Sequence, residues 1–124
     1  MIAVVDDDTS FLRSIGRLLR SVGYAVKTFG SAREFLASLP ESPPQCAVLD
    51  IHMPEMTGFE LQDWLAAHGS CVPVVFMTGY DTPQARERAR QAGCFGFLPK
   101  GEPEAVASEC QCPARGLTKE AISP

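Results

Sequence analysis

Five short apolar runs alternate with amphipathic stretches along the first 100 residues, and this alternation constrains the fold more than any other feature of the sequence. Four of the runs are nearly continuous in apolar character, which is typical of strands that are covered on both faces. The remaining run contains Lys27 and Thr28, so we expect it to be an edge strand. The expected strands lie at 2–5, 24–29, 46–49, 72–77 and 95–98.

Helical periodicity fills the stretches between these runs. In 9–22, apolar residues recur at the spacing of one helix face, arginines take the opposite face, and Gly23 stands where a C-terminal cap is expected. Similar patterns predict helices at 31–39, 57–68 and 82–92. The apolar face of 82–92 consists of alanines alone, so we expect that helix to be weakly held and mobile.

Strands that alternate with helices in this way predict an α/β domain built on a parallel sheet with right-handed crossovers. The segment that should form the fifth helix is weaker than the others, because only 104–110 has helical character and Pro113 and Gly116 follow it. We therefore expect one domain at 1–110, with a weak or atypical fifth helix, and a tail or linker at 111–124.

The charge balance and the length of the apolar runs exclude several classes of protein. The 15 acidic and 11 basic residues give a formal net charge of −4, which disfavours direct binding to DNA or RNA. No apolar run approaches the roughly 18–20 residues that cross a bilayer, and the acidic start does not resemble a signal peptide. The 5 cysteines form no disulfide framework and no complete metal-binding pattern. We therefore expect a cytoplasmic protein with reduced thiols and no membrane contact.

Polar side chains follow four of the expected strands at the point where each strand ends. Asp6 and Asp7 follow the first strand, Asp50 the third, Thr78 the fourth and Lys100 the fifth. Because the carboxyl ends of parallel strands share one edge of the sheet, these groups should meet there. Two carboxylates ~4 Å apart repel by about 4 kcal/mol at an effective dielectric constant of about 20, and a hard divalent cation removes that cost. An all-oxygen site with vacant positions suits Mg²⁺, which in turn favours a phosphoryl ligand.

Four short motifs carry a resemblance to a known family. They are VVDDD at 4–8, LDIHMPEMTG at 49–58, VVFMTG at 74–79 and AGCFGFLPK at 92–100. Together they resemble the receiver domain of bacterial two-component response regulators, and the resemblance covers residues 1–100. It implies a flavodoxin-like fold, in which a doubly wound parallel sheet of five strands has the order 2-1-3-4-5.

The resemblance implies a role for each aspartate at the strand ends. Asp50 matches the phosphoacceptor, which takes a phosphoryl group from the phosphohistidine of a sensor histidine kinase. Asp6 and Asp7 match the acidic pair that binds Mg²⁺ together with Asp50 and the backbone carbonyl of His52. Such a protein is a phosphoacceptor that promotes its own phosphorylation and dephosphorylation on aspartate, and it is not otherwise an enzyme.

Further residues match the parts of the family that respond to phosphorylation. Thr78 and Lys100 match the groups that bind phosphoryl oxygens, and Phe97 matches the aromatic switch whose rotamer follows Thr78. Pro54 and Gly58 match residues that shape the loop after the phosphoacceptor. In the family, the surface of the fourth helix, fifth strand and fifth helix contacts an output domain or a partner protein, or forms a homodimer.

Two features depart from the family pattern. Gly101 follows Lys100 where receivers usually have proline, often through a cis peptide. A cis bond before a residue other than proline costs about 2.5–4 kcal/mol, so we expect Lys100 to be less rigidly aimed. The poor fifth helix would leave the edge of the fifth strand exposed, which favours self-association by strand exchange.

Other interpretations of the same residues remain open. VVDDDTS at 4–10 approximates the signature of haloacid-dehalogenase-type phosphatases, with Asp6 as nucleophile and Asp8 as acid/base, but this leaves the motif at 49–58 unexplained. A receiver-like docking module that acts without phosphorylation would fit the departures from the family pattern. In a purely structural interpretation, Asp8 caps the following helix, and Phe97 is part of the core.

Overall fold

The computed structural model describes residues 1–39, 44–70, 72–80, 82–92, 96–101 and 105. Strands and helices alternate through them, and their bounds agree with the hydrophobic pattern to within about two residues. In chain order the elements are β1 (Ile2–Val5), α1 (Thr9–Ser21), β2 (Val26–Phe29), α2 (Ala32–Ser38), β3 (Cys46–Asp50), α3 (Gly58–Ala67), β4 (Val74–Thr78), α4 (Pro83–Gln91) and β5 (Gly96–Pro99).

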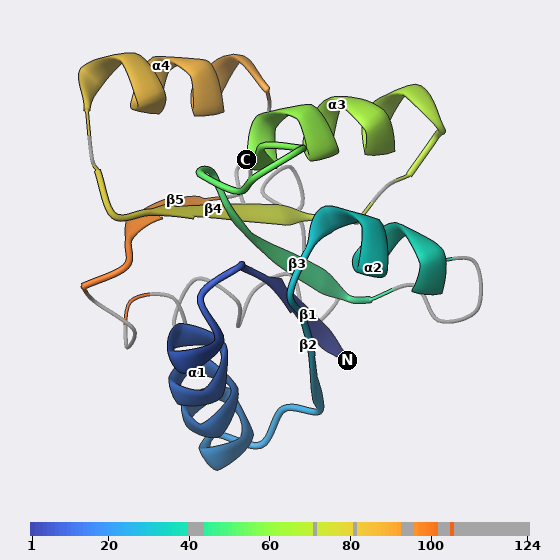
Figure 1. Cartoon of the computed structure of the whole chain (residues 1–124), viewed down its shortest axis with the longest axis vertical. Helices are drawn as coiled ribbons and strands as arrows, with labels where there is room; N and C mark the ends of the chain where they lie inside the picture. Colours follow the sequence, from blue (N-terminus) through green and yellow to red (C-terminus); the bar gives the residue numbers. More distant parts are fainter. Residues whose placement is uncertain (40–43, 71, 81, 93–95, 102–104, 106–124) are drawn as a thin grey trace, which may run out of the picture.

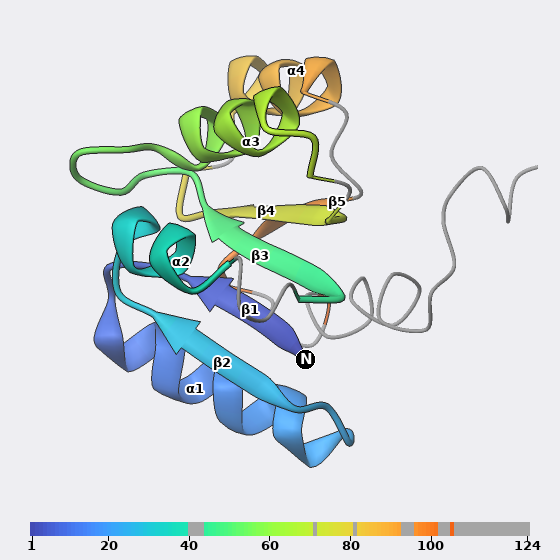
Figure 2. The same ribbon diagram turned by 90° about the vertical axis from the view of Figure 1, so that its right-hand side faces the viewer.

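The strands form one parallel sheet in the order β2-β1-β3-β4-β5, as the resemblance implied (Figure 1, Figure 2). β3 lies at its centre between β1 and β4, and every residue in these three strands is buried. Within the part of the sheet that the structure describes, β2 pairs with β1 alone and exposes Lys27 and Thr28, which confirms the predicted edge strand. β5 is only half-buried along its whole length, so the prediction that it is covered on both faces is wrong. It is the opposite edge of the described sheet and pairs with β4 alone.

The start of β2 differs from the expected boundary because the preceding residues end α1. The Gly23 N–H donates to the Arg20 carbonyl at 3.0 Å, and the Tyr24 N–H donates to the Leu19 carbonyl at 3.1 Å. These bonds satisfy two of the last carbonyls of the helix. Gly23 has a φ of 101°, a left-handed conformation that glycine adopts without a Cβ clash. Tyr24 is therefore part of the helix cap and not of β2.

Helices cover both faces of the sheet. α1 packs on one face, where Leu12, Ile15 and Leu19 join a core with alternate residues of β1, β3 and β4. α2, α3 and α4 lie on the other face (Figure 1), where Phe35 and Leu61 join a second core. Because alternate strand residues enter opposite cores, the central strands are apolar up to their ends.

α4 buries only Ala89, as its alanine face predicts. An arginine adds contacts to α3: Arg88 donates to Asp63 at 3.0 Å, and its guanidinium lies 5.4 Å from the centre of the Phe59 ring. Such exposed ionic and cation–π contacts each contribute about 1 kcal/mol or less. α4 is therefore held mainly by surface contacts.

Several predicted segments fall outside the described residues. These are the domain boundary at 110, the tail at 111–124 and the predicted helix at 104–110, of which only residue 105 is described. Cys46 is buried in the core beneath α1, and the other cysteines also fall outside the described residues. Within the part of the chain that is described, no helix has the length and apolar character needed to span a membrane.

Candidate functional site

Three aspartates converge where β1 and β3 end. Asp50 is the last residue of β3, and Asp6 and Asp7 directly follow β1, so the pairing of the two strands brings them together. One carboxylate oxygen from each lies within 4.8 Å of the other two. Asp6 and Asp50 are buried, with exposed fractions of 0% and 2%, whereas Asp7 is exposed. The carboxylates that follow separate strands in the sequence therefore form one cluster.

Each buried carboxylate is oriented by the backbone that follows it. The Asp8 N–H donates to Asp6 Oδ1 at 2.9 Å, and the His52 N–H donates to Asp50 Oδ1 at 3.2 Å. One oxygen of each group is thus positioned by a turn of its own chain. The second oxygens face the ammonium of Lys100, which lies 2.7 Å from Asp6 Oδ2 and 3.2 Å from Asp50 Oδ2.

Lys100 is positioned over the carboxylates by contacts of its backbone and its side chain. Its backbone N–H donates to the Thr78 carbonyl at 2.9 Å. Its ammonium lies 5.2 Å from the centre of the Phe11 ring, which is within the range of cation–π attraction. No peptide bond in the described residues is cis. The amine therefore reaches both carboxylates with Gly101, and not proline, at the next position.

Burial and charge shift the protonation of this cluster. Burial raises the pKa of Asp50 from 3.8 to about 7, and the neighbouring Asp6 carboxylate adds to the increase, while Lys100 opposes it. Burial alone would lower the pKa of Lys100, but the contacts with Asp6 and Asp50 outweigh burial and raise it. One ammonium does not fully compensate two buried carboxylates, so a further positive charge would stabilise the ionised site.

The donor set fits Mg²⁺. Asp6, Asp7 and Asp50 supply a cluster of carboxylate oxygens, which are the hard ligands that this ion prefers. Asp6 Oδ2 is buried and has no well-aligned hydrogen bond within the described residues, so its contact with Lys100 is an ion pair. These three aspartates would hold the ion, and ligation by the backbone carbonyl of His52 stays a prediction.

The hydroxyl of Thr78 is engaged by its own loop. Thr78 is buried at the end of β4, and its Oγ1 donates to the Tyr80 carbonyl at 3.0 Å and accepts from the Tyr80 N–H at 2.9 Å. Tyr80 is 74% exposed, and its ring meets the His52 ring edge to face, with the centroids 5.8 Å apart. No sequence motif pointed to Tyr80. The signal for it is its position on the loop that follows a strand end beside the site.

The loop after Asp50 depends on a close approach of the backbone. The Gly58 N–H donates to the Ile51 carbonyl at 3.1 Å, and a Cβ at Gly58 would lie 2.5 Å from the carbonyl oxygen of Asp50. A side chain at this position would displace the loop or the end of β3. Pro54 lies in the same loop, and its carbonyl accepts from the Met56 N–H at 2.8 Å. The steric requirement at Gly58 gives a physical basis to the loop-shaping role predicted for it.

The structure shows the surroundings of Phe97 and Asp8, two residues for which the sequence allowed more than one role. Phe97 of β5 is partly buried against the core beneath α2, α3 and α4, and the Arg86 guanidinium lies 5.2 Å from the centre of its ring. This is a packing position, and the switching role of Phe97 stays a prediction. Asp8 is the N-cap of α1, because its Oδ1 accepts from the Phe11 N–H at 3.1 Å. Its carboxylate therefore has the capping role.

The comparison with known proteins decides the family. The family model described as the response regulator receiver domain matches residues 2–108. This chain belongs to that family. It is 40% identical over 101 residues to the response regulator protein TmoT of Ectopseudomonas mendocina, a match that covers 81% of this chain and 46% of that protein. It is also 40% identical over 100 residues to nodulation protein W of Bradyrhizobium diazoefficiens, covering 81% of this chain and 44% of that protein.

Solved receiver structures share the fold. The structure of FixJ-N has a TM-score of 0.84 at 29% identity and covers 94% of both chains. A response regulator receiver protein from Burkholderia phymatum has a TM-score of 0.80 at 42% identity and covers 94% of this chain and 95% of that one. The chain is thus a flavodoxin-like receiver domain of the two-component response regulators. It spans less than half the length of the curated relatives TmoT and nodulation protein W.

Proposed function

We propose that this receiver accepts a phosphoryl group on Asp50 from the phosphohistidine of a sensor histidine kinase. The observation that carries the proposal is the convergence of three aspartates with Lys100 at one edge of the sheet. Two buried carboxylates that one amine incompletely compensates suit a site that takes up a divalent cation together with a phosphoryl group. Membership of the receiver family supports the same role.

In the transfer, a carboxylate oxygen of Asp50 attacks phosphorus while the bond from phosphorus to the histidine nitrogen breaks. The electron pair of that bond stays on the imidazole, and an acyl phosphate forms on Asp50. Asp6, Asp7 and Asp50 would hold Mg²⁺, which would supply positive charge to offset the carboxylates and the phosphoryl oxygens. Lys100, 3.2 Å from Asp50 Oδ2, is close enough to bind a phosphoryl oxygen once the group is attached.

The response begins at the end of β3, where the acyl phosphate carries about two negative charges in place of the single charge of the Asp50 carboxylate. Thr78 donates to a phosphoryl oxygen only after its Oγ1 releases the Tyr80 carbonyl, and this release frees the loop between β4 and α4 to rearrange. α4 follows that loop and buries only Ala89, which makes it the neighbouring element that moves at least cost. In this proposal Phe97 moves with Thr78, and the packing of β5 changes with it.

Phosphorylation changes the surface formed by α4, β5 and the predicted fifth helix. This surface would contact an output domain or a partner protein, or would form a homodimer. The half-buried β5 supports a contact there, because an edge strand offers unpaired backbone groups. The proposal includes a cytoplasmic location, where sensor kinases present their phosphohistidine.

Treatment with acetyl phosphate and Mg²⁺, followed by intact mass measurement, tests the assignment of Asp50. The wild type should gain one phosphoryl group, and Asp50→Asn should gain none. Asp8→Asn is the matched control, because it removes a neighbouring carboxylate and keeps a good N-cap, so labelling should persist. Labelling of Asp50→Asn would contradict the proposal and favour the phosphatase interpretation, in which Asp6 is the nucleophile.

A further inference from the structure

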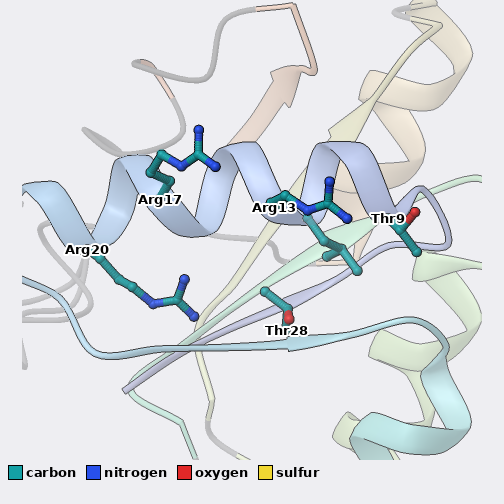
Figure 3. Close-up of a pocket in the computed structure, with 6 residues that line it drawn as sticks. Thr9, Arg13, Arg17, Arg20 and Thr28 are labelled. Atoms are coloured by element: carbon teal, nitrogen blue, oxygen red, sulfur yellow. The ribbon is translucent and has the colours of Figure 1, made fainter.

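A row of arginines on α1 lies beside the exposed edge strand β2 of the sheet. It borders a groove of about 470 Å³ between α1 and β2 (Figure 3), and no acidic residue is among the described residues that line it. The groove is therefore strongly cationic in a chain whose formal net charge is −4. The lining residues are Thr9, Leu12, Arg13, Arg17 and Arg20 of α1 and Thr28 of β2.

The arginines of the groove are largely uncompensated. Arg13, Arg17 and Arg20 follow one another at intervals of four and three residues and so share one face of α1, where like charges repel. Arg20 donates to the Val26 carbonyl at 3.3 Å. Arg13 and Arg17 have no hydrogen bond or ion pair with any residue that the structure describes. A ligand with several carboxylates would remove the repulsion, because a guanidinium binds a carboxylate through two parallel N–H bonds.

Gly16 keeps the space between α1 and β2 open. It is buried in the middle of α1, and a Cβ there would lie 3.3 Å from a guanidinium nitrogen of Arg20 and 3.6 Å from the methyl carbon of Thr28. Glycine inside a helix costs roughly 1 kcal/mol relative to alanine. The helix thus carries a destabilising residue at the position where a side chain would crowd the groove.

The edge of β2 offers backbone groups to the same groove. The Asp6 N–H donates to the Phe29 carbonyl at 3.1 Å, so Phe29 and alternate residues before it face β1. Val26 and Thr28 therefore turn their N–H and C=O groups away from the sheet. Among the described residues, Arg20 alone makes a hydrogen bond at this edge, to the Val26 carbonyl, and the backbone groups of Thr28 stay available. An exposed edge of this kind is a template for an added strand.

We propose that this groove binds an extended acidic segment of a partner protein, which adds to the edge of β2 and directs alternate acidic side chains toward the arginines of α1. Alternate residues of a strand are roughly 7 Å apart, and Arg13 and Arg17 are separated by about 6 Å along the helix axis. The two spacings therefore match. A small phosphate compound would use the charges of the groove but not the backbone edge at Thr28, so an acidic strand satisfies more of the site.

Two octapeptides of identical composition test the proposal on the full chain, without phosphorylation. One alternates glutamate and threonine, and the other carries its glutamates in one block. Calorimetry at low salt should detect binding of the alternating peptide, and the amide signals of Val26–Phe29 should shift in NMR spectra. The double variant Arg13→Gln/Arg17→Gln should weaken binding about tenfold. The control Arg33→Gln/Arg90→Gln, which removes the same charge outside the groove, should leave the affinity unchanged.

Three outcomes would overturn the proposal. Equal affinity for the block peptide would show that charge alone, and not strand addition, drives binding. Equal weakening by the control variant would place the site elsewhere. Inorganic pyrophosphate could displace the bound alternating peptide at a lower concentration than the same peptide added as competitor. That result would identify a phosphate compound, and not an acidic segment, as the ligand.

Discussion

Replacement of Asp50 by asparagine should stabilise the metal-free protein at pH 8 and leave its stability nearly unchanged at pH 4. Burial and then Asp6 raise the pKa of Asp50 from 3.8 to about 7. The folded protein therefore binds this proton more tightly than the unfolded chain does, and ionisation of Asp50 weakens the fold. The penalty is absent below about pH 4, where both states are protonated, grows between about pH 4 and 7, and is complete above about pH 7.

The size of the effect is set by two opposing contributions. The rise of the pKa from 3.8 to about 7 corresponds to about 4 kcal/mol if the site does not relax. Asparagine also gives up the ion pair with Lys100 at 3.2 Å, and water reaches the site beside exposed Asp7. We therefore expect a gain of about 2 kcal/mol in the free energy of unfolding at pH 8.

Urea unfolding of the wild type and Asp50→Asn, followed by circular dichroism at pH 4, 6 and 8 with EDTA present, measures this gain. The difference between the two proteins should increase with pH. Asp8→Asn, which changes an exposed capping carboxylate, should show no comparable increase. A difference that is the same at pH 4 and 8, or a variant that is less stable than the wild type at pH 8, would refute the reasoning.

Three further perturbations probe the same site. Gly58→Ala should lower the free energy of unfolding by about 2–3 kcal/mol, because the new Cβ would lie 2.5 Å from the Asp50 carbonyl oxygen. Gly30→Ala, whose nearest contact would be 3.7 Å, should cost less than about 1 kcal/mol in the same urea experiment, and equal costs would contradict the steric argument. Lys100→Met should destabilise the metal-free protein by about 1–2 kcal/mol, because it removes the cation that pairs with Asp6 and Asp50. The same variant should bind Mg²⁺ more tightly in calorimetry, because the ammonium and the ion would compete for these carboxylates, and an unchanged affinity would show that they do not. Excess Mg²⁺ should raise the melting temperature of the wild type more than that of Asp50→Asn, and an equal rise in both would place the ion elsewhere.

Much of the fold and the aspartate cluster could be predicted from the sequence because both depend on local patterns. Apolar runs of strand length separated by helical periodicity determine an alternating α/β order, and a parallel sheet then places the ends of its strands at one edge. Asp6, Asp7 and Asp50 could be assigned to one site by this rule alone. The distances between these carboxylates and Lys100 could not be predicted, because such distances depend on how the turns orient each side chain.

Other features depend on contacts between segments that no local pattern reports. Tyrosine is common in strands, but the Tyr24 N–H bonds to a carbonyl at the end of α1. β5 is apolar, but it lies at an edge of the described sheet. Thr78 was expected at the site, whereas the engagement of its hydroxyl by Tyr80 is a property of the folded loop. The sequence predicts only that the arginines of α1 lie opposite its apolar face. The groove that they line depends on the course of β2 beside the helix.

The position of the phosphoryl group after reaction with acetyl phosphate tests most directly whether the strand-end residues form one phosphoacceptor pocket. Borohydride reduction of the acyl phosphate, followed by peptide mapping, locates the modified carboxylate. Modification should appear at Asp50 alone and should require Mg²⁺. Modification of Asp6, or the same yield at Asp50 in the presence of EDTA, would contradict the account.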